Sequence, residues 1–168
     1  TPQCVLEPFS GTGTTEVVCA NKGIESVALE INPFLVWLGN TKLKIYSPEI
    51  IEEFLGVAKN ITENIESYNP VKLPPIYNIY RWWGEEQAEF LAKLKSAIKA
   101  VKDNDVQQLL CIAFCRIVIE LSNAAFNHVS TSFKKSNDSV FSVDIGIDTY
   151  LSICNMVAHG ASIQPLVS

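Results

Sequence analysis

Two carboxylates and two glycines near the start of the chain have the types and spacing of a site for a small polar ligand. Cys4–Glu7 is expected to be a short strand that ends in a carboxylate, and Gly11 and Gly13 follow it in a Gly-x-Gly turn before a helix. Such a turn presents backbone N–H groups and the positive end of a helix dipole to a ligand. Glu30 ends a second expected strand. Its distance along the chain from the glycines is close to the roughly 20 residues at which a carboxylate reaches ribose hydroxyls.

Three kinds of ligand compete for this pattern. A P-loop requires Gly-Lys-Ser/Thr after the glycines, whereas Gly13-Thr14-Thr15 stands here. A dinucleotide fingerprint requires a third small residue at the position that Glu16 occupies. The interpretation that remains is a nucleoside cofactor without a pyrophosphate, such as S-adenosylmethionine.

The first of two motifs reads Glu7-Pro8-Phe9-Ser10-Gly11-Thr12-Gly13-Thr14-Thr15. It is similar to the cofactor motif of the S-adenosylmethionine-dependent DNA amino-methyltransferases. The second, Glu30-Ile31-Asn32-Pro33, resembles the ribose-binding motif that follows it in that family. The resemblance covers residues 4–44. Glu7 stands where the family usually has Asp, and the family's catalytic motif, a polar residue before Pro-Pro and an aromatic residue, is not found.

This resemblance implies S-adenosyl-L-methionine as the cofactor and a direct methyl transfer to an exocyclic amino group of adenine or cytosine in a flipped DNA base. It implies that backbone groups of Phe9–Gly13 approach the methionine moiety, that Glu7 orients its polar end, that Glu30 holds the ribose hydroxyls and that Asn32 lies beside the adenine. The candidate cofactor-binding residues are Glu7, Pro8, Phe9, Ser10, Gly11, Thr12, Gly13, Thr14, Glu30, Ile31 and Asn32.

Catalytic residues are expected beyond Ser168, so this chain alone is expected to bind cofactor weakly and not to catalyse. The sequence begins without Met, which suggests a fragment or a processed chain. Three alternatives stay open: an RNA methyltransferase, a non-catalytic helical interaction module with a degenerate cofactor turn, and a nicotinamide-binding protein. His128 and His159 lack partners at ligand spacing, so no metal site is expected.

The net charge of −5 disfavours a broad DNA-binding surface, because proteins that grip duplex phosphates are usually basic on at least one face. DNA contact is therefore expected mostly outside this chain, with the polar loop 123–135 as the candidate within it. A second, weaker candidate is Arg81-Trp82-Trp83 together with the lysines that follow. No membrane span is expected, and the cytoplasm is the default location.

The predicted fold class is α/β, with a partial Rossmann-like methyltransferase core over residues 1–46 and a large α-helical insertion over 47–168. Helices are expected at about 16–22, 33–44, 47–67, 84–102, 106–121 and 143–159. Leu73-Pro74-Pro75-Ile76-Tyr77 is interpreted as a proline-rich connector between helices and not as a catalytic loop. The five cysteines are predicted to be reduced, buried small hydrophobes.

Overall fold

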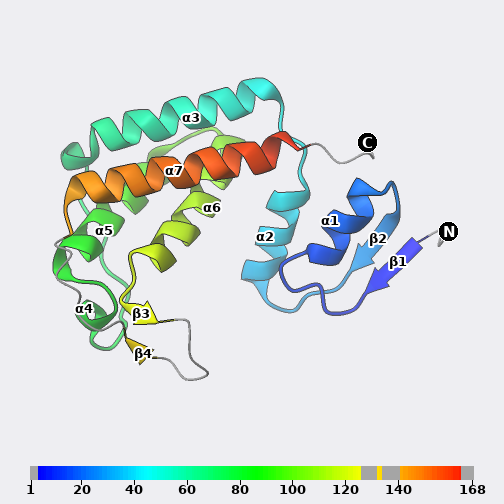
Figure 1. The fold of residues 1–168 in the computed structure, drawn as a ribbon, viewed down its shortest axis with the longest axis horizontal. Helices are drawn as coiled ribbons and strands as arrows, with labels where there is room; N and C mark the ends of the chain where they lie inside the picture. The colour runs from blue at the N-terminus through cyan, green and yellow to red at the C-terminus, as the bar shows by residue number, and fades with distance from the viewer. Residues whose placement is uncertain (1–3, 126–131, 134–140, 164–168) are drawn as a thin grey trace. The chain divides into compact units, whose positions relative to one another are not determined.

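The computed structural model describes residues 4–125, 132–133 and 141–163 (Figure 1). The chain is mixed α/β, mostly helical with a small parallel sheet. Its internal contacts divide it into two compact units. The sheet unit comprises the residues up to Ile51 and those from Ala158 onward, and the helical unit is Glu52–Val157. Among the described helices, none has the length and apolar character that crossing a membrane requires.

The sheet unit alternates strands and helices in the expected order: β1 (Cys4–Glu7), α1 (Thr14–Asn21), β2 (Glu25–Ala28) and α2 (Pro33–Leu43). The two strands are parallel, with Cys4 opposite Glu25 and Glu7 opposite Ala28, and α1 packs beside both (Figure 1). Because parallel strands end at the same edge of a sheet, both chain turns that carry the candidate residues leave from that edge. The apolar side chains of Leu6, Val27 and Leu29 are exposed.

Local capping sets the helix bounds in this unit. α1 begins at Thr14, earlier than the predicted Glu16, because Gly13 takes a left-handed conformation (φ 76°) as its N-cap. Gly23, also left-handed (φ 68°), follows the helix end and suits the reversal into β2. α2 begins with a proline at its first position, and the side chain of Asn32 accepts a hydrogen bond from the Phe34 N–H at 3.0 Å.

The helical unit holds the large buried side chains. Its elements are α3 (Pro48–Glu63, which begins in the sheet unit), η1 (Ile65–Ser67), α4 (Ile79–Trp82), α5 (Glu85–Ala100), α6 (Asn104–Glu120), β3 (Ala124–Ala125), β4 (Ser132–Phe133) and α7 (Val143–Ser162, whose last turn belongs to the sheet unit). α6 begins two residues earlier than predicted, because Asp103 accepts hydrogen bonds from the N–H groups of Asp105 and Val106. The apolar stripes of α3, α5, α6 and α7 supply the core, which includes Phe54, Leu94, Ile98, Leu109, Leu110, Ile117 and Tyr150.

The prediction that all five cysteines are buried is wrong for Cys4, which is exposed at the start of β1. Cys19 and Cys154 are buried, and Cys111 and Cys115 are partly buried. All five are free thiols. A strand at the margin of a two-stranded sheet has little to cover its first residue, which explains the exposure of Cys4.

Cys154 is expected to resist alkylation in the folded protein at pH 8. Burial raises the pKa of its thiol to about 12, so almost no thiolate forms, and the thiolate is the nucleophile. Iodoacetamide labelling followed by peptide mass spectrometry checks this expectation, with Cys4 as the internal control that reacts. Labelling of Cys154 at the rate of Cys4 in the native protein would contradict the described packing.

Candidate cofactor-binding site

The Glu7 carboxylate ties the end of β1 to the first turn of α1. Its Oε1 accepts a hydrogen bond from the Phe9 N–H at 3.0 Å, and its Oε2 accepts one from the Thr15 hydroxyl at 2.9 Å. The turn between them is closed by the Gly13 N–H, which donates to the Ser10 carbonyl at 3.1 Å. One acidic side chain therefore fixes both ends of the Gly-x-Gly turn.

The Glu30 carboxylate joins this turn to the start of α2. Its Oε2 accepts from the Gly11 N–H at 2.8 Å, and its Oε1 accepts from the Asn32 N–H at 2.8 Å. The backbone continues the same connection, because the Ser10 N–H donates to the Leu29 carbonyl at 3.0 Å. The structure thus brings the two predicted motifs together through direct hydrogen bonds, although they lie about 20 residues apart in sequence.

Both glycines of the turn have backbone conformations that L side chains rarely adopt. Gly11 has φ 56° and Gly13 has φ 76°. A Cβ on Gly13 would also lie 3.3 Å from the Cα of Gly39 in α2, closer than ordinary contact. Lys42, near the end of α2, donates to the Thr12 carbonyl at 2.6 Å. Glycine is therefore required at position 13 by conformation and by the close approach of α1 and α2.

The remaining candidate residues form an open rim. The side chain of Phe9 is 87% exposed and that of Ile31 is 97% exposed. Pro8, Thr12 and Thr14 are also exposed. Apolar side chains this exposed beside two turns have no packing role within the described residues, and they give a flat ring or a base a surface to rest on.

Glu16 is a residue to which sequence reasoning assigned no role. Its side chain is only 4% exposed, and within the part of the chain that the structure describes neither carboxylate oxygen has a hydrogen-bond partner. Its Oε2 would lie 3.7 Å from a Cβ on Gly13, so the carboxylate folds back toward the turn. It stands in the first turn of α1, where the helix dipole favours negative charge. In the sequence, the signal for a role of this residue was an acidic side chain in the first turn of a helix that follows a Gly-x-Gly turn.

Glu30 is ionised over the whole neutral and mildly acidic range. Hydrogen bonds from the backbone N–H groups of Asn32 and Gly11 hold its pKa below the ordinary value of 4.5, because they favour the charged form. A group with a lowered pKa keeps its contribution above its ordinary pKa and loses it as the pH falls through the lowered value. A ligand held by this carboxylate should therefore bind with constant affinity between pH 7 and pH 5.

Titration calorimetry at several pH values checks this expectation for any ligand of the site. Affinity should fall only below the ordinary carboxyl range, under about pH 4.5. A loss of affinity that begins near pH 6.5 would instead implicate a histidine-like group.

The two candidate DNA-contacting regions differ in what the structure describes. Asn127, His128, Ser130, Thr131, Lys134 and Lys135 of the 123–135 loop lie outside the described residues. Trp82 packs edge-on against Phe133 with ring centroids 5.0 Å apart, and the Arg81 guanidinium lies 4.1 Å from the centre of the Phe133 ring. The Asn123 N–H donates to the Trp82 carbonyl at 2.7 Å. These side chains of α4 therefore make packing contacts with the β3–β4 pair.

No group of three or more His, Cys, Asp or Glu side chains within the described residues is arranged to hold a metal ion. The candidate site itself offers carboxylates, backbone amides and exposed apolar side chains.

Comparison with known proteins gives one similarity over a short stretch. No family model matches the chain, and no solved structure matches it at a significant level. The Type II methyltransferase M.MjaII of Methanocaldococcus jannaschii is 32% identical over 65 residues, which cover 36% of this chain and 12% of that protein. The chain thus spans only a small part of the curated relative's length. This similarity supports a methyltransferase relationship in general terms.

Proposed function

We propose that this chain is the S-adenosylmethionine-binding part of a DNA methyltransferase that transfers a methyl group to an exocyclic amino group of adenine or cytosine. The proposal rests mainly on the position of the Glu30 carboxylate. It accepts hydrogen bonds from the N–H groups of Gly11 and Asn32 at the carboxyl edge of two parallel strands. Ligands of α/β folds bind at this edge. The similarity to a Type II methyltransferase supports the same assignment.

The residues present fit the cofactor's nucleoside. Each Glu30 oxygen accepts one backbone hydrogen bond and keeps a lone-pair site for one hydroxyl of a vicinal diol. The exposed Phe9 and Ile31 offer apolar surface for an adenine ring. In this proposal Asn32, whose side chain caps α2, lies beside the adenine through its backbone.

Charge at the turn favours a cationic ligand over a dinucleotide. Glu7, Glu16 and Glu30 all place carboxylates at or beside the Gly-x-Gly turn, and both Glu16 oxygens lack a partner within the described residues. A pyrophosphate brought to this turn would meet like charge, which costs binding free energy. S-adenosylmethionine carries a sulfonium, an ammonium and a carboxylate group, so its net positive charge complements the carboxylates of the turn.

In the proposed mechanism, this chain holds and positions the cofactor. When bound, the cofactor supplies a methyl group activated by the positive sulfur. Glu30 would hold the ribose, Glu7 would keep the turn in shape and orient the polar end of the ligand, and the Phe9–Gly13 backbone would approach the methionine moiety. Fixing one reactant in this way removes much of the entropic barrier to a bimolecular transfer. The groups that bind the target amino nitrogen lie outside the motifs found here, and DNA contact by the 123–135 loop remains part of the proposal.

The experiment is a calorimetric titration of the chain with S-adenosylhomocysteine, with NAD as the matched control. We expect saturable binding of one equivalent of S-adenosylhomocysteine and no binding of NAD. Ligand binding should also raise the thermal midpoint as the ratio of ligand concentration to Kd increases. A folded chain that binds neither ligand would favour a non-catalytic module with a degenerate turn, and preferential binding of NAD would replace the proposal.

A further inference from the structure

A cavity lies within the helical unit, formed by residues other than those of the proposed cofactor site. It has a volume of about 530 Å³, within the range of about 300–1,000 Å³ typical of sites for small organic ligands. One wall is the segment 71–76, which includes most of the proline-rich connector, and the other walls come from α4, Trp83, α5 and α6. The connector is held to α5 by the Val71 N–H, which donates to the Ala92 carbonyl at 3.2 Å.

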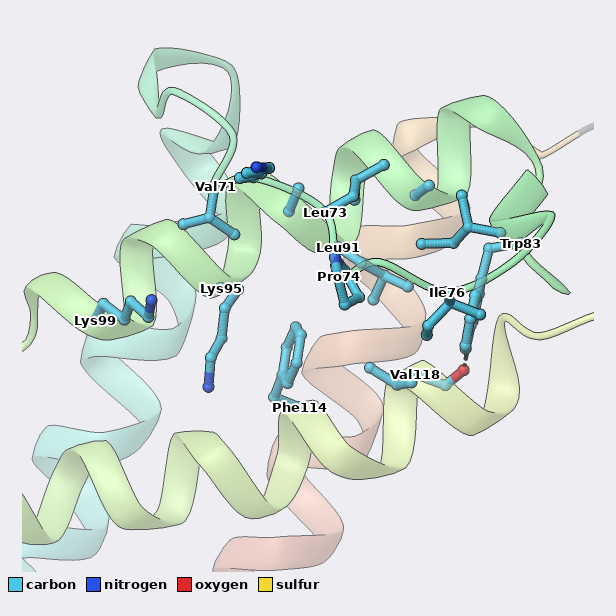
Figure 2. Close-up of a pocket in the computed structure, with 14 residues that line it drawn as sticks. Val71, Leu73, Pro74, Ile76, Trp83, Leu91, Lys95, Lys99, Phe114 and Val118 are labelled. Carbon is cyan, nitrogen blue, oxygen red and sulfur yellow. Dashed lines mark hydrogen bonds between the residues drawn. The ribbon is translucent and has the colours of Figure 1, made fainter.

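The cavity has an apolar body and a cationic end. Figure 2 shows Lys95 and Lys99 on one side of Phe114, with Ile76, Trp83 and Val118 on the other. Lys95 Nζ lies 5.1 Å from the centre of the Phe114 ring. Within the described residues, neither lysine forms an ion pair, whereas the neighbouring Lys93 is held by Glu66 and Glu89. The lining contains no acidic residue, in a chain whose net charge is −5.

The polar groups of the cavity define the ligand's chemistry. The Trp83 indole N–H is already donated to the Val118 carbonyl at 2.8 Å, so the ring presents carbon to the cavity. Lysine ammonium groups donate hydrogen bonds and accept none. A nucleobase would leave its own donors unpaired against this lining, and an unpaired buried donor is costly. A carboxylate needs only donors and counter-charge, and an aliphatic body needs only apolar surface.

We propose that this cavity binds an elongated amphipathic carboxylate, with its anionic head at Lys95 and Lys99 and its aliphatic body running past Phe114 toward Ile76 and Trp83. An anion is favoured by the charge of these two lysines, and Lys72, a third lysine of the lining, adds to the positive charge around the cavity. The proposal does not depend on the cofactor site, because every lining residue lies in the helical unit.

Calorimetric titration of the chain with decanoate tests the proposal, with octanoate, hexanoate and decyltrimethylammonium as comparison ligands. We expect saturable binding of decanoate that weakens about fourfold for each methylene removed, as burial of a hydrocarbon chain requires. Decyltrimethylammonium should bind more weakly than decanoate, and 0.5 M salt should reduce the difference because the lysines are partly exposed.

Two variants and one control separate the two ends of the cavity. The double variant Lys95→Gln with Lys99→Gln should weaken decanoate binding roughly fivefold, as expected for exposed charge pairs, and remove the preference over decyltrimethylammonium. Ile76→Asn, on the exposed connector, should weaken decanoate and decyltrimethylammonium alike. Lys102→Gln removes an exposed lysine outside the lining and should leave binding unchanged.

Three results would overturn the proposal. One is the absence of saturable decanoate binding by the folded wild-type chain. Another is equal affinity of the wild-type chain for the anionic and cationic amphiphiles. The third is an acidic apolar peptide that binds through Lys95 and Lys99 while decanoate does not, which would assign the cavity to a protein partner.

Discussion

Glu30→Ala is expected to weaken the binding of S-adenosylhomocysteine by at least about 100-fold. The substitution removes the acceptor of two proposed ribose hydrogen bonds, and hydrogen bonds to a charged acceptor are stronger than those between neutral groups. It also releases the N–H groups of Gly11 and Asn32, which Glu30 holds at 2.8 Å each. The turn would then lose the connection that orders it toward the ligand. Calorimetric titration of the variant against wild type measures the loss.

Glu25→Ala is the matched control for this substitution. Glu25 is an exposed carboxylate at the start of β2, at the opposite end of the same strand from Glu30. The Glu25→Ala variant should bind S-adenosylhomocysteine with the affinity of the wild type. If Glu30→Ala kept wild-type affinity while remaining folded by circular dichroism, the ligand would have to bind elsewhere and the proposed site would be wrong.

Gly13→Val is expected to destabilise the chain by roughly 2–4 kcal/mol and to abolish cofactor binding. At φ 76° a β-branched side chain is strained, and the added Cβ would meet the Cα of Gly39 at 3.3 Å. The contact is backbone, so neither helix can relieve it by rotating a side chain. α1 and α2 must move apart, and the turn that their approach holds must change shape. Urea unfolding, followed by circular dichroism, measures the free energy of unfolding.

Gly56→Ala gives the opposite expectation in the same assay. Gly56 lies in the interior of α3, and a Cβ there meets nothing within 4 Å. Alanine should stabilise the chain by about 0.5–1 kcal/mol because it reduces the backbone entropy of the unfolded state. An unchanged unfolding midpoint for Gly13→Val would mean that the turn tolerates a side chain and that its glycine is not a structural requirement.

Local signals in the sequence were sufficient for the elements around the candidate site. Asn32 before Pro33 marks the start of a helix, and Glu7 before Pro8 marks the end of a strand, because each depends on residues next to it in the chain. The parallel pairing of β1 with β2 agrees with their strand–helix–strand order, which favours parallel strands. The larger Rossmann-like core stays a prediction beyond these two strands.

Tertiary contacts account for what the sequence did not predict. Glu16 is buried although it is an acidic residue in the first turn of a helix, and the hydrogen bond from Lys42 to Thr12 joins residues 30 positions apart. The connector around Pro74 was recognised from its turn chemistry, but nothing local indicates that Ile76 faces a cavity with residues of α6. Cys4 was expected to be buried because apolar strands usually are, and a two-stranded sheet leaves such a position uncovered.

The uneven distribution of buried side chains has a consequence for how the protein opens. The largest fully buried side chains lie in the helical unit, whereas Leu6 of β1, Val27 of β2 and Leu29 just after β2 are exposed. We therefore expect a lower free energy of local unfolding for the sheet unit than for the helical unit. Its amide protons should exchange with solvent before those of α5 and α6. A ligand held by Glu7 and Glu30 would join the ends of both strands. Ligand binding at this site would then stabilise the folded sheet and slow its opening.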